Sequence, residues 1–191
     1  MVASFALTDP HLQPILDRLH KSSEAQEPGL IAFHVLRFIL EKLGLSSWLS
    51  ADDFQSFMRD KYVALERDKS QFCYLIVRAI SAKTVVEVGS SFGVSTIYLA
   101  AGVRDNGHDE RGIVIATENE PTKIAKAKEN WEEAKLTKWI KLLEGDVSET
   151  LRDVHLDDPI DLVLMDIWAP IALPSLKSLI SKLKKGMCHL I

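Results

Sequence analysis

"VVEVGSSFGVSTIYLA", residues 85–100, places two glycines and three serines between an apolar run and a segment of helical character. The run is rich in valine and predicts a buried strand that ends at Glu87. Gly89 and Gly93 mark a tight turn, and a helix is expected to start near Val94. The stretch therefore predicts a strand, a glycine turn and a helix in direct succession.

The rest of the chain repeats this alternation. Short runs rich in Val, Ile and Leu are separated by segments with helical spacing; the runs are residues 112–117, 140–145, 160–166 and 187–191. Strands that are buried on both faces form continuous apolar runs, and helices between them cover a parallel sheet. The sequence predicts an α/β fold with a doubly wound, mainly parallel, Rossmann-like sheet of about five strands. This domain is expected over residues 61–191, behind an N-terminal helical cap over residues 1–60.

The cap is expected to contain three helices. Asp9 followed by Pro10 predicts the start of the first, and Ser50 predicts the start of the third. The second, residues 30–43, is apolar almost all round and is expected to be buried against neighbours or a partner subunit. A fourth helix, residues 68–81, leads into the first strand.

Composition excludes several classes of partner. The chain has 191 residues and a formal net charge of -4, so it shows no excess of Lys and Arg that would favour nucleic acid. No window approaches the roughly 18 apolar residues that span a bilayer. The N-terminus does not resemble a signal peptide. Cys73 and Cys188 fit neither a metal-ligand spacing nor a disulfide framework. We expect a cytoplasmic protein of one domain with two free, buried thiols.

Acidic residues end the other strands. In an open parallel sheet, ligands bind at the carboxyl ends of the strands. Glu118 follows the second strand at a distance typical of an acid that binds a ribose diol, or it caps the next helix. Asp146 follows the third strand and either accepts from an adenine amine or caps a short helix. Asp166 follows the very apolar fourth strand, which favours a functional carboxylate.

The turn itself discriminates between cofactors. A dinucleotide fingerprint has the pattern G-x-G-x-x-G, whereas this loop is "GSSFGV", with Ser91 and Val94 at the second and third glycine positions. Close approach of a pyrophosphate is therefore disfavoured, and an adenosine cofactor without phosphates fits better. The hydroxyls of Ser90, Ser91 and Ser95 can donate to its polar end.

These motifs together resemble the class I S-adenosylmethionine (SAM)-dependent methyltransferases, specifically the small-molecule O-methyltransferases of the catechol and caffeoyl-CoA type. The resemblance covers about residues 60–191 and includes Gln71, before the first strand, and Trp168, after the fourth. It implies that SAM or S-adenosylhomocysteine (SAH) is the cofactor. It also implies the binding residues: Glu87, Gly89, Ser91, Gly93 and Ser95 at the methionyl end, Glu118 at the ribose, Asp146, Val147 and Ser148 at the adenine, and Asp166 beside the reacting centre as the catalytic residue.

Two departures bear on the chemistry. Catechol-type enzymes have a basic lysine where this chain has Ala169. They also bind a divalent cation through the fourth-strand aspartate and an Asp-Asn pair beyond the fifth strand, and the sequence given stops before that pair. Asp166 alone supplies too few oxygens for such an ion. We expect no tightly bound metal and either a truncated chain or a partner subunit that covers the last strand.

The main hypothesis is O-methylation of a small-molecule hydroxyl. One alternative is a non-catalytic cofactor-binding or interaction protein with the same fold, and a weaker one is an NAD-dependent reductase. The apolar segment at residues 30–43 favours a homodimer.

Overall fold

The computed structural model describes residues 6–45, 57, 61–62, 64–107 and 111–190. The predicted third helix, from Ser50, lies outside these residues. The elements in chain order are α1 (Leu12–Glu24), α2 (Glu27–Lys42), α4 (Arg67–Ala79), β1 (Thr84–Val88), α5 (Val94–Asp105), β2 (Ile113–Glu118), α6 (Pro121–Glu133), the 3-10 turn η2 (Thr137–Trp139), β3 (Ile140–Glu144), α7 (Val147–Asp153), β4 (Ile160–Met165), α8 (Ala169–Leu179), η3 (Ile180–Lys182) and β5 (Leu183–Leu190).

The five strands form one sheet in the order β3-β2-β1-β4-β5, and every neighbouring pair is parallel. The predicted Rossmann-like fold is confirmed. The chain builds outward from β1 to β3 and then returns to place β4 on the other side of β1, so the order reverses between β1 and β4. Val88 is level with Thr117 on β2 and with Met165 on β4. The carboxyl ends of three strands therefore meet at the reversal point, where such sheets bind ligands.

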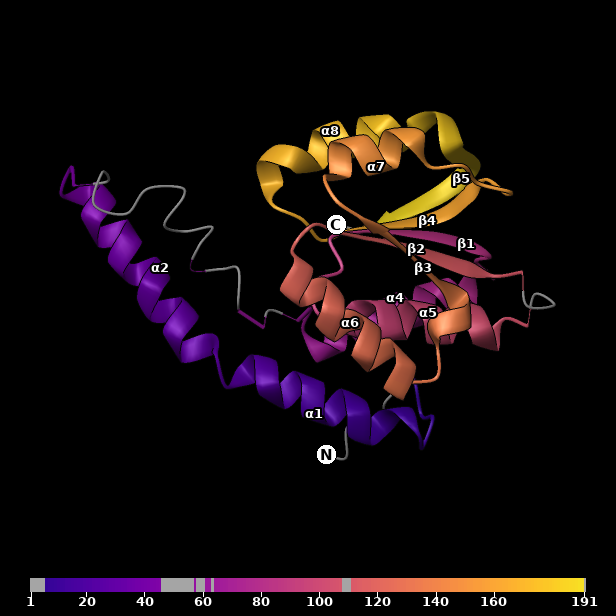
Figure 1. Cartoon of the computed structure of the whole chain (residues 1–191), viewed down its shortest axis with the longest axis horizontal. Helices are drawn as coiled ribbons and strands as arrows, with labels where there is room; N and C mark the ends of the chain where they lie inside the picture. The colour runs from indigo at the N-terminus through magenta and orange to yellow at the C-terminus, as the bar shows by residue number, and fades with distance from the viewer. Residues whose placement is uncertain (1–5, 46–56, 58–60, 63, 108–110, 191) are drawn as a thin grey trace.

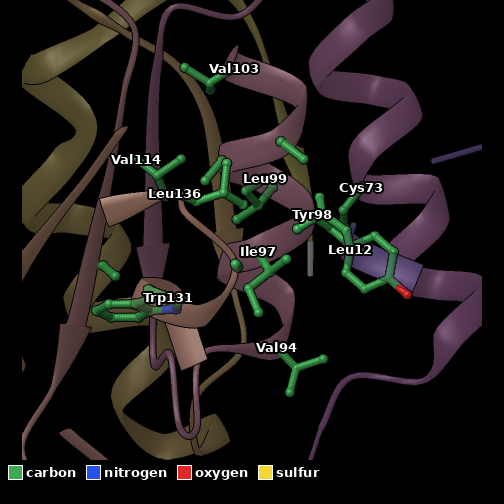
Figure 2. Packing of buried hydrophobic residues seen from close by; sticks show 14 of the residues in the cluster. Leu12, Cys73, Val94, Ile97, Tyr98, Leu99, Val103, Val114, Trp131 and Leu136 are labelled. Carbon is green, nitrogen blue, oxygen red and sulfur yellow. The ribbon is translucent and has the colours of Figure 1, made fainter. Parts of the chain in front are cut away.

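Helices cover both faces of the sheet. Figure 1 shows α4, α5 and α6 on one face and α7 and α8 on the other. Helix α5 is buried over ten consecutive residues, 94–103, because it lies between the sheet, α4 and α1. Figure 2 shows the packing around it, with Tyr98 and Leu99 beside Leu12 and Cys73. The start of α5, which follows the glycine turn, is therefore held by the main core.

The first helix is part of that core. Leu12, Leu16 and Leu19 of α1 are buried in the same cluster as the sheet. The helix begins at Leu12, two residues after the predicted first position at Pro10, although the Asp9 carboxylate accepts from the backbone N–H of His11 at 2.8 Å just before it. Helix α1 thus packs as one body with residues of the sheet domain, while the domain division at residue 60 stays a prediction.

The prediction that the second helix is buried is wrong within this chain. Helix α2 begins at Glu27, three residues earlier than expected, because Pro28 fits the first turn of a helix. Figure 1 shows it extending away from the sheet. Its apolar side chains face solvent: Ile31 is 61% exposed, Phe38 59% and Leu43 65%. An apolar sequence made the helix look internal; in the described part of the chain, Phe57 stacks on Phe33 of this helix, with 3.9 Å between the ring centroids, and leaves the side chains named above exposed.

Smaller expectations are settled by the same structure. Cys73 is free and buried, as predicted; Cys188 lies in β5, where only the backbone is described. Helix α8 begins at Ala169, earlier than its apolar spacing suggests, because Pro170 again takes a first-turn position. Among the described residues, no helix has the length and apolar character needed to cross a membrane.

Candidate functional site

The glycine turn after β1 is fixed by unusual backbone angles. Gly89 has φ +89°, Ser91 φ +49° and Gly93 φ +77°, all in the left-handed region that glycine adopts most easily. The Ser90 N–H donates to the Thr117 carbonyl at 2.9 Å, which ties the turn to the end of β2. The turn therefore passes over the carboxyl end of the sheet in a defined shape.

Gly89 is needed because another backbone lies against it. A Cβ at this position would be 2.3 Å from the carbonyl oxygen of Asp166. The Asp166 N–H in turn donates to the Val88 carbonyl at 3.0 Å. The predicted conformational role of Gly89 is confirmed, and it has a structural consequence: the two chain segments that leave β1 and β4 are in contact.

The predicted role of Gly93, close approach to a ligand, does not fit the geometry. A Cβ here would be 2.2 Å from Nε1 of Trp131. The indole N–H of Trp131 donates to the Gly93 carbonyl at 3.0 Å, and Figure 2 shows this ring beneath the turn. The absence of a side chain at Gly93 therefore accommodates a buried tryptophan from α6. That the backbone of Gly93 binds a cofactor stays a prediction.

Glu87 and Ser95 are also directed inward. Glu87 is fully buried, and its carboxylate accepts from the hydroxyls of Ser95 and Thr96 on the first turn of α5. Burial raises the pKa of Glu87 to about 7, with the nearby charges of Asp166 and Glu118 acting in the same direction and the two hydroxyls opposing them. In this structure the two side chains join β1 to the first turn of α5. That they contact a cofactor stays a prediction.

Glu118 does reach the turn from the end of β2. One carboxylate oxygen accepts from the Ser91 N–H at 2.8 Å, and the other accepts from the N–H groups of Asn119 and Glu120 at 2.9 and 3.0 Å. The side chain is half-buried. It therefore lies beside the glycine turn with one acceptor position left over, on the oxygen that binds Ser91, and this position can accept from a ribose hydroxyl. The ribose assignment stays a prediction.

In the loop after β3, Asp146 caps a helix, which is the alternative to a role in binding adenine. The exposed carboxylate of Asp146 accepts from the N–H of Ser148 at 2.7 Å and from its hydroxyl, and so caps α7. These hydrogen bonds hold the pKa of Asp146 below its ordinary value. The Gly145 N–H donates to the Glu118 carbonyl at 2.9 Å, which ties the loop that carries Asp146 and Val147 to the end of β2. Contact of this loop with adenine stays a prediction.

Asp166 is the first residue after β4. Its side chain is exposed at one side, yet partial desolvation raises its pKa from the ordinary value, against the opposing charge of Lys69. Among the described residues no hydrogen bond to its carboxylate exists. Trp168, two residues later, is 52% exposed and precedes α8. A carboxylate with free acceptor capacity beside an exposed indole suits a polar hydroxyl on an apolar molecule.

Unpartnered polar atoms mark the ligand side of the turn. In the described part of the chain, the hydroxyls of Ser90 and Ser91 are buried without a hydrogen-bond partner, and Ser90 is only 2% exposed. Buried hydroxyls without partners are rare and call for an absent partner. The sequence indicated both serines as donors. It did not indicate Thr117, whose Oγ1 accepts from the Gly89 N–H at 3.0 Å, or Asn130, which donates to the Phe92 carbonyl at 2.9 Å.

Gln71 lies elsewhere. Its Oε1 accepts from the Leu7 N–H at 2.8 Å, so this residue joins α4 to the N-terminal segment. No group of three or more His, Cys, Asp or Glu side chains that could hold a metal occurs among the residues that the structure describes.

Residues 86–190, more than half of the chain, match the family model for a methyltransferase domain. The chain belongs to this methyltransferase family. Its relatives include the catechol O-methyltransferase of Mycobacterium tuberculosis, 28% identical over 139 residues, or 73% of this chain and 59% of that protein. The catechol O-methyltransferase of Niastella koreensis is 26% identical over 110 residues, 56% of this chain and 48% of that protein. The chain thus spans between about half and three fifths of these relatives.

A solved methyltransferase shares the fold. The O-methyltransferase of Bacillus cereus, in complex with SAH, superposes with a TM-score of 0.61 at 18% identity, covering 91% of this chain and 73% of that one. The family match and the two catechol O-methyltransferase relatives confirm the resemblance to class I SAM-dependent O-methyltransferases. They favour neither the reductase nor the non-catalytic alternative.

Proposed function

We propose that this methyltransferase domain binds SAM at the carboxyl ends of β1, β2 and β4 and transfers its methyl group to a small-molecule hydroxyl. The observation that carries the proposal is the pair of buried, unpartnered hydroxyls on Ser90 and Ser91, in a turn that is bonded to Glu118. A turn with spare donors next to a carboxylate with a spare acceptor position fits an amino acid joined to a ribose. The Bacillus cereus neighbour in complex with SAH supports the same choice.

The donor and acceptor sides are assigned to different residues. The backbone of Gly89 and Gly93 and the hydroxyl of Ser91 would hold the methionyl end, Glu118 the ribose, and the loop of Asp146, Val147 and Ser148 the adenine. The bound cofactor supplies an activated methyl group on a sulfonium. What remains for the protein is to align the acceptor and keep water away.

Asp166 is the proposed catalytic residue. Its backbone lies where the two chain segments leaving β1 and β4 touch, and its side chain is exposed at this edge of the sheet, so its carboxylate can accept a hydrogen bond from the acceptor hydroxyl and orient its oxygen. It would also take the proton that the hydroxyl loses when its oxygen is methylated, and a raised pKa makes it a stronger base for this than an ordinary carboxylate. Exposed Trp168 would hold the apolar part of the acceptor. No part of this assignment needs a lysine at Ala169.

Calorimetric titration with SAM and with SAH tests the cofactor. Binding in the micromolar to millimolar range is expected for the wild type, and Glu118→Ala should weaken it by about tenfold or more, because a charge-assisted hydrogen bond is lost. Glu129→Gln on the outer side of α6 is the control and should bind as the wild type does. Undetectable binding of both compounds up to millimolar concentration would sink the proposal.

Turnover is tested with catechol, the acceptor in the names of the curated relatives, with and without Mg²⁺. Asp166→Asn should lower kcat at least tenfold at saturating SAM, because it removes the carboxylate that orients the acceptor hydroxyl. If the variant methylates as fast as the wild type, Asp166 has no catalytic role.

We also propose that α2 is the contact surface of a homodimer. Its exposed residues Ile31, Val35, Phe38 and Ile39 lie on successive turns, and an apolar face of this length is typical of helix pairing. Light scattering should give twice the chain mass for the wild type and the single mass for Val35→Glu combined with Phe38→Glu. A monomeric wild type would refute this proposal.

A further inference from the structure

Glu87 carries a carboxylate at the centre of the fold with no opposite charge beside it. It pairs with Ala116 on β2 and with Leu164 on β4, and its side chain is fully buried. Its two oxygens accept from neutral hydroxyls, those of Ser95 and Thr96. A buried carboxylate normally requires a cation or several hydrogen bonds to stay ionised.

The charges that act on Glu87 are acidic, and the cation closest to this group of acids, Lys69 on α4, acts on Asp166. Asp166, after β4, and Glu118, at the end of β2, repel the negative charge of Glu87. Glu87 in turn is near enough to the thiol of Cys73 on α4 to raise the pKa of that thiol. Among the described residues, no ion pair reaches Glu87. Ionised and protonated forms of Glu87 are therefore close in free energy near neutral pH, as its pKa of about 7 indicates.

The protonation state of Glu87 changes the strength of the hydrogen bonds that hold the start of α5. An ionised carboxylate accepts charge-assisted hydrogen bonds from both hydroxyls, whereas a protonated carboxyl makes only neutral hydrogen bonds with them, which are weaker. Ser95 and Thr96 belong to the first turn of α5, directly after Gly93. Protonation thus weakens the bonds that hold the start of α5 to β1, and with them the turn that carries Ser90 and Ser91.

The two forms of the proposed cofactor differ by one positive charge. SAM has a sulfonium where SAH has a neutral thioether, and the rest of the two molecules is the same. A positive charge that enters an acidic pocket stabilises every ionised carboxylate nearby. Glu87 lies on the strand between Glu118 and Asp166, the proposed ribose and acceptor residues, so a sulfonium bound between those residues acts on it.

We propose that Glu87 is a positioning residue that couples the charge of the cofactor to the shape of the glycine turn. Binding of the sulfonium keeps Glu87 ionised and its two hydroxyl bonds intact. SAM therefore binds with release of a proton and is favoured over SAH. This inference rests on the proposed function. It gives Glu87 a role in distinguishing substrate from product without direct contact with either.

Calorimetric titration at pH 7.5 and pH 6.0 tests the coupling. The affinity of the wild type for SAM should fall by up to about tenfold at the lower pH, which is the limit for one linked proton on a group of pKa about 7, and its affinity for SAH should fall by less. In Glu87→Gln the loss for SAM should be under about twofold. Any titration of the cofactor itself is common to both proteins and cancels in the comparison. Glu129→Gln, an exposed change on α6, should keep the wild-type pH dependence.

A second variant keeps the test valid if Glu87→Gln does not fold. Thr96→Val removes one hydroxyl that favours the ionised form, so the pH at which SAM affinity falls should move upward. Equal pH dependence in the wild type and Glu87→Gln, or an unmoved midpoint in Thr96→Val, would overturn the inference while SAM still binds. Absence of SAM binding at both pH values would instead refute the proposed function.

Discussion

Replacement of Gly93 by alanine should remove a large part of the stability of the domain. The new Cβ would lie 2.2 Å from Nε1 of Trp131 and 2.6 Å from Cε2, so the buried indole must shift. Three contributions add: about 1 to 2 kcal/mol for a side chain at φ +77°, about 1 to 3 kcal/mol for overpacking, and about 1 kcal/mol for the bond from the indole to the Gly93 carbonyl. The expected loss is about 3 to 6 kcal/mol, against a typical total of about 5 to 15 kcal/mol.

Gly107→Ala is the matched control. Gly107 has φ +68°, similar to that of Gly93, but no described atom lies within 4 Å of the position its Cβ would take. This variant should lose only the backbone contribution, about 1 to 2 kcal/mol. Urea unfolding followed by circular dichroism gives both free energies on one scale. The difference between the two variants isolates the contact with Trp131 and should be at least about 2 kcal/mol.

A result in which the two alanine variants lose equal stability would refute the reasoning. It would mean that the tryptophan moves aside without cost and that Gly93 serves only the backbone angle. A G93A protein as stable as the wild type would also contradict the left-handed conformation itself.

Three further predictions follow from the same contacts. Asp146→Ala should lower the free energy of unfolding by about 0.5 to 2 kcal/mol, measured by urea unfolding, because α7 loses its cap, and Asp146→Ser should restore most of it. His20 is buried against the Tyr98 hydroxyl at 3.0 Å, and burial lowers its pKa to about 4. Because this pKa lies below the unfolded value of about 6.5, the contribution of neutral His20 to the free energy of unfolding is full above pH 6.5 and falls by up to about 3 kcal/mol toward pH 4. His20→Gln should lose less stability over this range. An equal loss in the variant and the wild type would contradict the role of His20. Gly89→Ala should separate the ends of β1 and β4 and abolish calorimetric SAM binding, since its Cβ would be 2.3 Å from the Asp166 carbonyl oxygen.

The strands were predictable because their signal is local. Each buried strand is a continuous apolar run bounded by glycine or an acid, and residues 84–88 and 160–165 need no tertiary information to be identified. The acids at the strand ends follow from the same pattern, since parallel strands bring their carboxyl ends together. Glu118 and Asp166 were located in this way at the edge where the structure has them.

The partners of the turn were not predictable, because they depend on contacts between distant residues. Trp131 lies 38 residues beyond Gly93 and gives only an apolar position on a helix in the sequence. Glu87 was assigned to a ligand because a strand-end acid usually faces outward, whereas the hydroxyls of α5 turn it inward. For α2 the hydrophobic pattern indicated burial without saying which surface would provide it.

The bond between Trp131 and the glycine turn gives this protein an intrinsic optical probe. Its indole is 3% exposed and donates to the carbonyl that precedes α5, whereas Trp168 is about half exposed on the acceptor side. Emission from the first should therefore be blue-shifted and sensitive to the order of the turn, and quenching by dissolved iodide should act on the second. The chain has four tryptophans, so a variant with Phe at the other three, Trp48, Trp139 and Trp168, allows the ordering of the turn to be followed through Trp131 without a label.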